Sequence, residues 1–278
     1  MSGSDIRRIR LVVSDVDGTL IDPEKRVTDR AKDAVRKLRE AGIGFSIISA
    51  RPPAGVRELV AELGLTEPIG CMNGAVIISP RQEILCETPL EQSDTRKAGT
   101  IILAFGLALW AFVGCEWYAT DSSGPHVAAH VELLGHPPLP LESVDDLPPR
   151  VDKLVGVSDD YTAVEGCELV VQNQCGVHVS ATRSQQHYLD VTNAHVDKGT
   201  GVEQLAELMQ VPLAEVATIG DMPTDTFMFR KSGLSIAMGN ASAEVKSQAT
   251  AVTAANDEEG FAIAMEKYVL SRMASEKA

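Results

Sequence analysis

The sequence IRLVVSDVDGTL, residues Ile9–Leu20, is the part of the chain from which the fold can be predicted most directly. Within it, Ile9–Val13 is an apolar run broken only by Arg10, which is typical of a buried strand in a parallel sheet. The run ends in Asp15 and Asp17, which indicates that the strand reaches the edge of its sheet there. Buried carboxylates need a cation or a proton as partner, although a simple Asx-type turn after the strand is the alternative.

Polar residues also follow two other apolar strands. Ala41–Ile48 is a glycine-containing turn and a strand followed by Ser49-Ala50-Arg51, and Val216–Ile219 is followed by GDMPTD, residues 220–225. Lys198 directly precedes a helical stretch. Open α/β sheets bind ligands at the carboxyl ends of their strands, so we expect these polar groups to gather at one edge. Carboxylate oxygens suit Mg²⁺, and a dianionic phosphate with Mg²⁺ fits the whole set.

Strands and helices alternate along the first 87 residues and again after residue 190. Examples are the helices expected from Thr28 to about Ala41 and from Pro52 to Gly64. This alternation predicts an α/β fold with a doubly wound, Rossmann-like parallel sheet. Between residues 88 and 190 the pattern changes to that of an α+β unit, with helices near Glu91–Phe105 and Gly124–Leu134. We therefore predict a core formed by residues 1–87 and 191–278, with residues 88–190 inserted as a second domain.

In order and spacing, these motifs resemble the haloacid dehalogenase (HAD) superfamily, and most closely its Cof-like sugar-phosphatase branch. The resemblance spans about Ile9 to Tyr268 and implies a HAD-like core with a large inserted cap that moves. It is carried by Asp15-Val16-Asp17-Gly18-Thr19, Ser49-Ala50-Arg51, Asn73-Gly74-Ala75, Lys198, and Gly220-Asp221 with Asp225.

The resemblance also implies a role for each motif residue. Asp15 would be the nucleophile that forms an aspartyl-phosphate, and Asp17 would protonate the leaving alcohol and then activate water. Mg²⁺ would be held at a site made by Asp15, the backbone carbonyl of Asp17, Asp221 and Asp225. Phosphate and substrate would be bound by Ser49, Ala50, Arg51, Asn73, Lys198 and Thr224.

Some of these assignments have simple structural alternatives. Lys198 could be a solvated surface lysine, and Arg51 could be an exposed residue beside a helix. Thr224 stands where this branch commonly has Asn, and it keeps a hydroxyl but lacks the two amide donors, which puts its role in doubt. His126 and His130 stand four residues apart, but the glutamate of an H-E-x-x-H zinc motif is missing, so we expect a structural or surface role for them.

The resemblance predicts a Mg²⁺-dependent phosphatase acting on a small phosphorylated metabolite, in particular a sugar phosphate. A phosphomutase would use the same motif residues, and a non-catalytic module that binds a cation or phosphate could also retain them. The formal charge of −14 argues against binding to nucleic acid or to anionic membranes. Five cysteines without a C-x-x-C pair favour a reducing cytoplasm, and we expect a monomer or a homodimer there.

Overall fold

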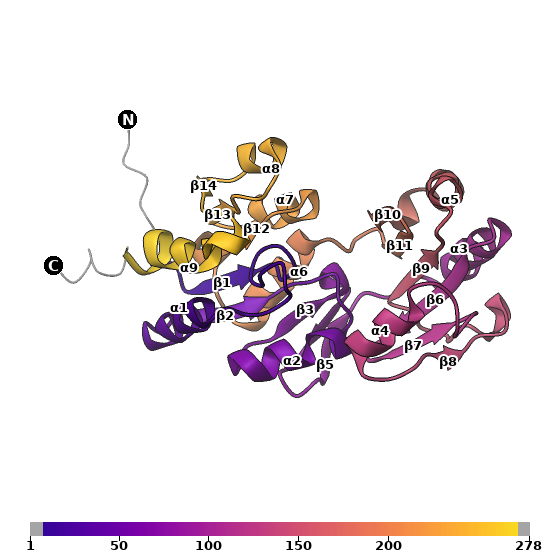
Figure 1. Cartoon of the computed structure of the whole chain (residues 1–278), viewed down its shortest axis with the longest axis horizontal. Helices are drawn as coiled ribbons and strands as arrows, with labels where there is room; N and C mark the ends of the chain where they lie inside the picture. The colour runs from indigo at the N-terminus through magenta and orange to yellow at the C-terminus, as the bar shows by residue number, and fades with distance from the viewer. Residues whose placement is uncertain (1–7, 272–278) are drawn as a thin grey trace. The chain divides into compact units, whose positions relative to one another are not determined.

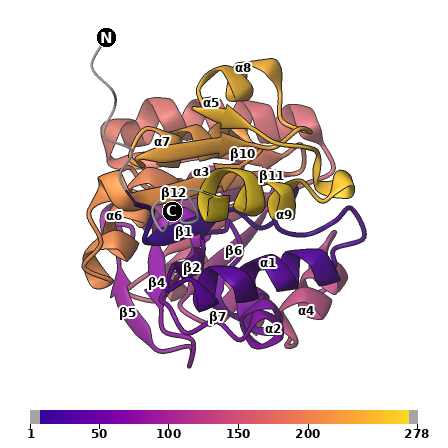
Figure 2. The same ribbon diagram turned by 90° about the vertical axis from the view of Figure 1, so that its left-hand side faces the viewer.

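The computed structural model describes residues 8–271, and the chain forms two compact units. The first unit comprises the described residues up to Ala50, then Glu58–Glu83, and those from Asp197 onward. The second comprises Arg51–Arg57 and Ile84–Val196. Each unit has its own sheet and helices (Figures 1 and 2). The domain boundaries expected from the sequence, at residues 88 and 190, stay a prediction.

The first unit is built on a five-stranded, fully parallel sheet in the order β14-β13-β12-β1-β2. The strands are β1 (Leu11–Ser14), β2 (Gly44–Ile47), β12 (Val216–Gly220), β13 (Leu234–Ala237) and β14 (Ala251–Val252). Strand β1 lies between β12 and β2, with Ser14 opposite both Ile219 and Ile47 (Figure 1). This confirms the α/β fold with a parallel sheet, and it brings the carboxyl ends of three strands to one edge.

Helices α1 (Asp29–Glu40), α7 (Thr226–Phe229) and α8 (Ala243–Ser247) lie between successive strands of this sheet. The first unit also contains α6 (Lys198–Leu208), α9 (Gly260–Ala264) and most of α2 (Pro53–Leu63), whose first residues belong to the second unit. Helix α1 begins as predicted, because the Thr28 hydroxyl accepts a hydrogen bond from the Ala31 amide at 3.1 Å. Strand β3 (Ile69–Cys71) joins the sheet edge through a parallel bridge between Ile48 and Gly70, and β4 (Val76–Ile78) pairs with β3 in antiparallel fashion.

The second unit contains a six-stranded sheet in the order β10-β11-β9-β6-β7-β8. Its strands are β6 (Ala108–Val113), β7 (Glu116–Ala119), β8 (Leu139–Pro140), β9 (Lys153–Val157), β10 (Val179–Gln185) and β11 (Tyr188–Asn193), and β5 (Ile84–Glu87) precedes them. Helices α3 (Gln92–Ala104) and α5 (Tyr161–Cys175) bury apolar side chains against this sheet, and α4 (Val127–Leu134) follows β7. The unit therefore has a core of its own, in agreement with the α+β unit expected from the pattern of helices and strands.

The two histidines with helical spacing have separate surroundings in this second unit. The His130 ring lies 4.9 Å from the Trp110 ring and 5.2 Å from the Trp117 ring. His126 instead interacts with the Asp159 carboxylate at 2.9 Å. Among residues 8–271, the one group of three acidic, histidine or cysteine side chains close enough to share a metal lies elsewhere, in the first unit. Within the same residues, no helix combines the length and apolar character needed to cross a membrane.

Candidate active site

The polar residues at the strand ends of the first unit meet at one edge of the parallel sheet. Asp15 directly follows β1, is 4% exposed, and donates its backbone N–H to the Ile219 carbonyl at 2.9 Å. Asp221 directly follows the neighbouring strand β12. Ser49 follows β2 on the other side, is buried, and donates its N–H to the Gly70 carbonyl at 3.0 Å. The sheet order thus brings together side chains that are far apart in the sequence.

Lys198 forms ion pairs with two carboxylates of this group. Its ammonium lies 2.5 Å from Asp15 Oδ1 and 2.5 Å from Asp225 Oδ1, and the side chain is only 4% exposed. Lys198 is the first residue of α6, whose start is fixed by the N-cap Asp197: its carboxylate accepts the Thr200 N–H at 2.8 Å. Lys198 is therefore a buried residue, and the alternative of a solvated surface lysine is wrong.

Asp225 is buried and its carboxylate organises the loop after β12. Oδ2 accepts the backbone N–H groups of Asp221 and Met222, both at 2.8 Å, while Oδ1 accepts from Lys198. Gly220 permits this close turn, because a Cβ at that position would lie 2.4 Å from the Asp225 carboxyl carbon. Asp225 thus orients both Lys198 and the backbone that carries Asp221.

The Asp221 carboxylate is held by two residues whose roles the sequence did not reveal. The Thr19 hydroxyl donates to Asp221 Oδ1 at 2.9 Å, and the Asn240 amide donates to Oδ2 at 3.2 Å. The same amide nitrogen donates to the Gly18 carbonyl at 2.9 Å. Thr19 belongs to the first motif. Asn240 is a polar residue that follows β13, the strand next to β12, and this position is the sequence feature from which its role in the site could have been predicted.

The electrostatics of the site fit a bound cation. Burial raises the pKa of Asp15 to about 7, although Lys198 opposes the shift, and burial likewise raises the pKa of Asp221 to about 6. For Lys198, burial favours the neutral amine, but the charges of Asp15 and Asp225 outweigh it and raise the pKa above its usual range. Two of the three carboxylates, those of Asp15 and Asp225, therefore share one ammonium.

A hard divalent cation suits the donor set. Asp15, Asp221 and Asp225 each offer a carboxylate oxygen, and these atoms lie within 4.8 Å of one another. Asp15 Oδ2 is buried and has no hydrogen-bond partner among the described residues. A buried carboxylate oxygen without a donor is a natural ligand for an ion that prefers oxygen, such as Mg²⁺.

The other predicted site residues lie in different surroundings. Asn73 has a left-handed backbone (φ 60°), donates its N–H to the Ser49 carbonyl at 2.8 Å, and has a buried Oδ1 without a hydrogen-bond partner among the described residues. Ala50 follows Ser49 at the end of the first segment of this unit. Thr224 is exposed, beside the buried Asp225. Arg51 belongs to the second unit, where it donates to the Gly55 carbonyl, so its contact with substrate stays a prediction.

Gly18 is expected to be required for the position of Asp221. Its φ is +85°, and a Cβ on Gly18 would lie 2.5 Å from Asp221 Oδ2. Gly18→Ala should therefore strain the backbone and displace the carboxylate, lowering the affinity of the site for a divalent cation by at least about tenfold, or about 1.4 kcal/mol. Calorimetric titration with Mg²⁺ measures this. Gly42→Ala is the matched control, since Gly42 also has a positive φ (73°) but has open space around it. Equal losses in both variants would contradict the explanation.

Comparison with known proteins agrees with this geometry. A family described as haloacid dehalogenase-like hydrolase matches residues 12–265. A putative phosphatase of Haemophilus influenzae is 27% identical over 259 residues, covering 93% of this chain and 97% of that protein. A phosphoglycolate phosphatase of Natronomonas pharaonis is 28% identical over 254 residues, covering 91% and 95% respectively.

A solved structure extends the match to three dimensions. A haloacid dehalogenase-like hydrolase from Bacteroides thetaiotaomicron superposes with a TM-score of 0.85 at 27% identity. The superposition covers 94% of this chain and 99% of the other. The match therefore extends over both units. This chain belongs to the haloacid dehalogenase-like hydrolase family.

Proposed function

We propose that this protein is a Mg²⁺-dependent phosphatase that hydrolyses a small phosphorylated metabolite, in particular a sugar phosphate, through an aspartyl-phosphate. The observation that carries the proposal is the buried group of Asp15, Asp221 and Asp225 around Lys198, with one oxygen of Asp15 left without a donor. Relatives named as phosphatases support the reaction class. Sugar phosphates are the favoured substrates because of the resemblance to the Cof-like branch.

In the first half-reaction, a carboxylate oxygen of Asp15 attacks phosphorus and the bond from phosphorus to the leaving oxygen breaks. Asp17 supplies the proton that makes the leaving group a neutral alcohol. In the second, Asp17 takes a proton from water, the water oxygen attacks phosphorus, and Asp15 is regenerated as inorganic phosphate is formed. Asp15 is set for attack because the Ile219 carbonyl and Lys198 fix its backbone and side chain.

Positive charge must offset the repulsion between the anionic nucleophile and the anionic phosphate. Lys198 provides one charge at 2.5 Å from Asp15, and we infer that Lys198 and Ser49 bind the phosphoryl oxygens. Mg²⁺, when bound by Asp15, the Asp17 carbonyl and Asp221, supplies further charge neutralisation. Because both oxygens of Asp225 already accept hydrogen bonds, we assign Asp225 to holding Lys198 and the Asp221 backbone as well as to the acidic site.

The direct test is an assay of released phosphate from a panel of phosphomonoesters, with Mg²⁺ and with a chelator. We expect hydrolysis of at least one sugar phosphate or related small metabolite, and loss of that activity with the chelator. Isomerised hexose phosphate without free phosphate would indicate a mutase instead. No reaction with sugar phosphates, nucleotides and phosphorylated cofactors would contradict the proposal.

Mg²⁺ is expected to stabilise the protein more at high pH than at low pH. The pKa values of about 7 for Asp15 and about 6 for Asp221 exceed the value of 3.8 for an unperturbed aspartate, so the folded metal-free protein binds more protons than the unfolded chain between these values. Its free energy of unfolding therefore falls as pH rises through this window. At about pH 8 the carboxylates are free to bind Mg²⁺, whereas at about pH 5 protons compete with the ion.

Thermal unfolding with and without Mg²⁺ measures the effect. At a concentration about 100 times Kd, Mg²⁺ should add about 2.7 kcal/mol, or several degrees in Tm, at the higher pH and much less at the lower one. Asp221→Asn should remove most of the difference. A shift in Tm that is the same at both pH values, or that survives in the variant, would place the ion elsewhere.

A further inference from the structure

We propose that Lys25 is a positioning residue for Asp17: its ammonium holds the Asp17 carboxyl where it can transfer a proton to the leaving group. This inference rests on the proposed phosphatase reaction. The Lys25 ammonium lies 2.7 Å from Asp17 Oδ1. Both residues belong to the first unit and lie in the short segment of chain that follows Asp15. Lys25 has no place among the sequence motifs of the site.

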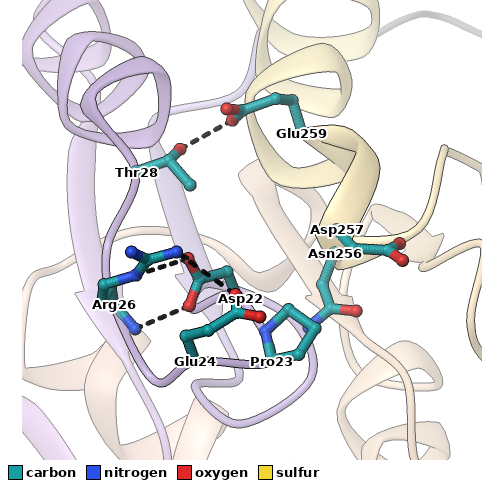
Figure 3. Close-up of a pocket in the computed structure, with 8 residues that line it drawn as sticks. All are labelled: Asp22, Pro23, Glu24, Arg26, Thr28, Asn256, Asp257 and Glu259. Atoms are coloured by element: carbon teal, nitrogen blue, oxygen red, sulfur yellow. Dashed lines mark hydrogen bonds and ion pairs between the residues drawn. The ribbon is translucent and has the colours of Figure 1, made fainter.

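The backbone around Lys25 is fixed by a braced turn. The Lys25 N–H donates to the Asp22 carbonyl, and the Asp22 N–H donates to the Arg26 carbonyl, both at 2.9 Å. The Asp22 carboxylate in turn accepts the Arg26 backbone N–H at 2.8 Å and two guanidinium bonds at 2.9 and 3.1 Å. Figure 3 shows Arg26 beside Asp22 in this turn. The Arg26 N–H and guanidinium hold the pKa of Asp22 below its usual range, so the Asp22 carboxylate stays ionised at neutral pH.

The turn is also anchored to the rest of the first unit. It forms one wall of a cavity of about 280 Å³, whose other wall contains Asn256, Asp257 and Glu259 (Figure 3). The Asn256 amide donates to the Ile21 carbonyl at 3.0 Å, next to the start of the turn, and the Asn256 N–H donates to Asn240 Oδ1 at 3.1 Å. Asn240 binds Asp221. The turn that carries Lys25 is thus tied through two asparagines to the acidic site.

Two properties of the pair argue against a purely structural role. The Lys25 side chain is 64% exposed and that of Asp17 is 39% exposed, and such pairs contribute only about 0–1 kcal/mol to stability. Lys25 also has a left-handed backbone, with φ of 64°, a conformation that is uncommon for a lysine. A hydrogen-bonded turn holds Lys25 in this uncommon conformation and places its ammonium beside Asp17. A role in positioning Asp17 for proton transfer explains this arrangement better than a contribution to stability.

The chemistry of the leaving group makes this testable. When the phosphorus–oxygen bond of an alkyl phosphate breaks, the oxygen needs a proton, and a positioned acid contributes about 10²–10⁴ in rate. The nitrophenolate released from p-nitrophenyl phosphate is a stable anion that needs no such proton. Loss of a residue that positions the acid should therefore slow the hydrolysis of sugar phosphates and leave the hydrolysis of the aryl ester nearly unchanged.

The experiment compares kcat/KM for a sugar phosphate and p-nitrophenyl phosphate in Lys25→Asn and Lys25→Arg, with saturating Mg²⁺. Asn tolerates the left-handed turn and removes the charge, whereas Arg keeps the charge. We expect Lys25→Asn to lose about 10-fold or more on the sugar phosphate, from the roughly 10²–10⁴ available, and less than about 3-fold on the aryl ester. Lys25→Arg should recover most of the loss. In an Asp17→Asn background, Lys25→Asn should cause no further loss.

Lys32→Asn is the matched control, since Lys32 is also a solvent-accessible lysine of the first unit in an ion pair, with Glu62 at 2.8 Å. It should leave both substrates unchanged. Equal losses on both substrates in Lys25→Asn, or the same loss in the Asp17→Asn background, would overturn the positioning role. Absence of any Mg²⁺-dependent hydrolysis by the wild-type protein would instead contradict the proposed function, so the two failures are distinct.

Discussion

Asp15→Asn is expected to lower turnover by at least about a thousandfold, which corresponds to about 4 kcal/mol in the activation barrier. The amide has nearly the shape of the carboxylate, but it is a poor nucleophile for phosphorus and carries no charge for a cation. Phosphate release at saturating substrate and Mg²⁺ measures the loss. The fold should survive, because the amide oxygen of the variant can still accept the hydrogen bond that Asp15 Oδ1 accepts from Lys198 at 2.5 Å.

Asp33→Asn is the control for this variant, because Asp33 is an aspartate of the same unit on α1, ion-paired with Lys37 at 2.7 Å and away from the strand ends. It should keep full activity. Near-normal turnover in Asp15→Asn would require a different nucleophile. If the wild-type protein and the variant were equally inert, a module that only binds a cation or phosphate would be favoured.

Lys198→Met is expected to remove activity and also to destabilise the protein by about 3–5 kcal/mol at neutral pH. The substitution keeps an apolar stem of similar length but leaves Asp15 and Asp225 buried without their ammonium. Removing one partner of a buried ion pair lowers the free energy of unfolding far more than removing one partner of an exposed ion pair. Because protonation would relieve the two carboxylates, the loss of stability should shrink as the pH is lowered.

Denaturant unfolding in the presence of a chelator measures this loss without compensation by a metal ion. Lys231→Met is the control, because Lys231 pairs with Glu203 at 2.7 Å on the surface, and its loss should cost less than about 1 kcal/mol. A change in stability for Lys198→Met that matched the control would show that the buried ion pairs do not form in solution.

Most of the first unit follows from local signals in the sequence. The apolar runs before Asp15, Ser49 and Asp221 are strands of the parallel sheet, and Thr28 caps α1 as its position suggested. The gathering of Asp15, Asp221 and Lys198 was also predictable, because the carboxyl ends of parallel strands share one edge. The burial of Lys198 was not, since it depends on the tertiary placement of α6.

Three features could not be predicted in the same way. Helix α5 was not predicted from the sequence. Its buried residues Val164, Cys167, Val171 and Cys175 do have helical spacing, but Gly166 and the β-branched valines of this segment lower its intrinsic helix propensity. Asn240 reaches Asp221 only because β13 pairs with β12. The contact of Lys25 with Asp17 depends on the conformation of a turn, which composition does not specify.

We propose that Asp15 accepts the phosphoryl group at the acidic strand end, and chemical trapping of the aspartyl-phosphate would identify the residue that carries it. The protein would be mixed with a hydrolysed substrate and Mg²⁺, quenched with borohydride, and digested for mass spectrometry. Reduction of an aspartyl-phosphate converts that aspartate to homoserine. We expect homoserine at position 15 of the peptide that contains Asp15 and Asp17, and none without Mg²⁺. Homoserine at another position, or an unmodified Asp15 under conditions of rapid turnover, would contradict it.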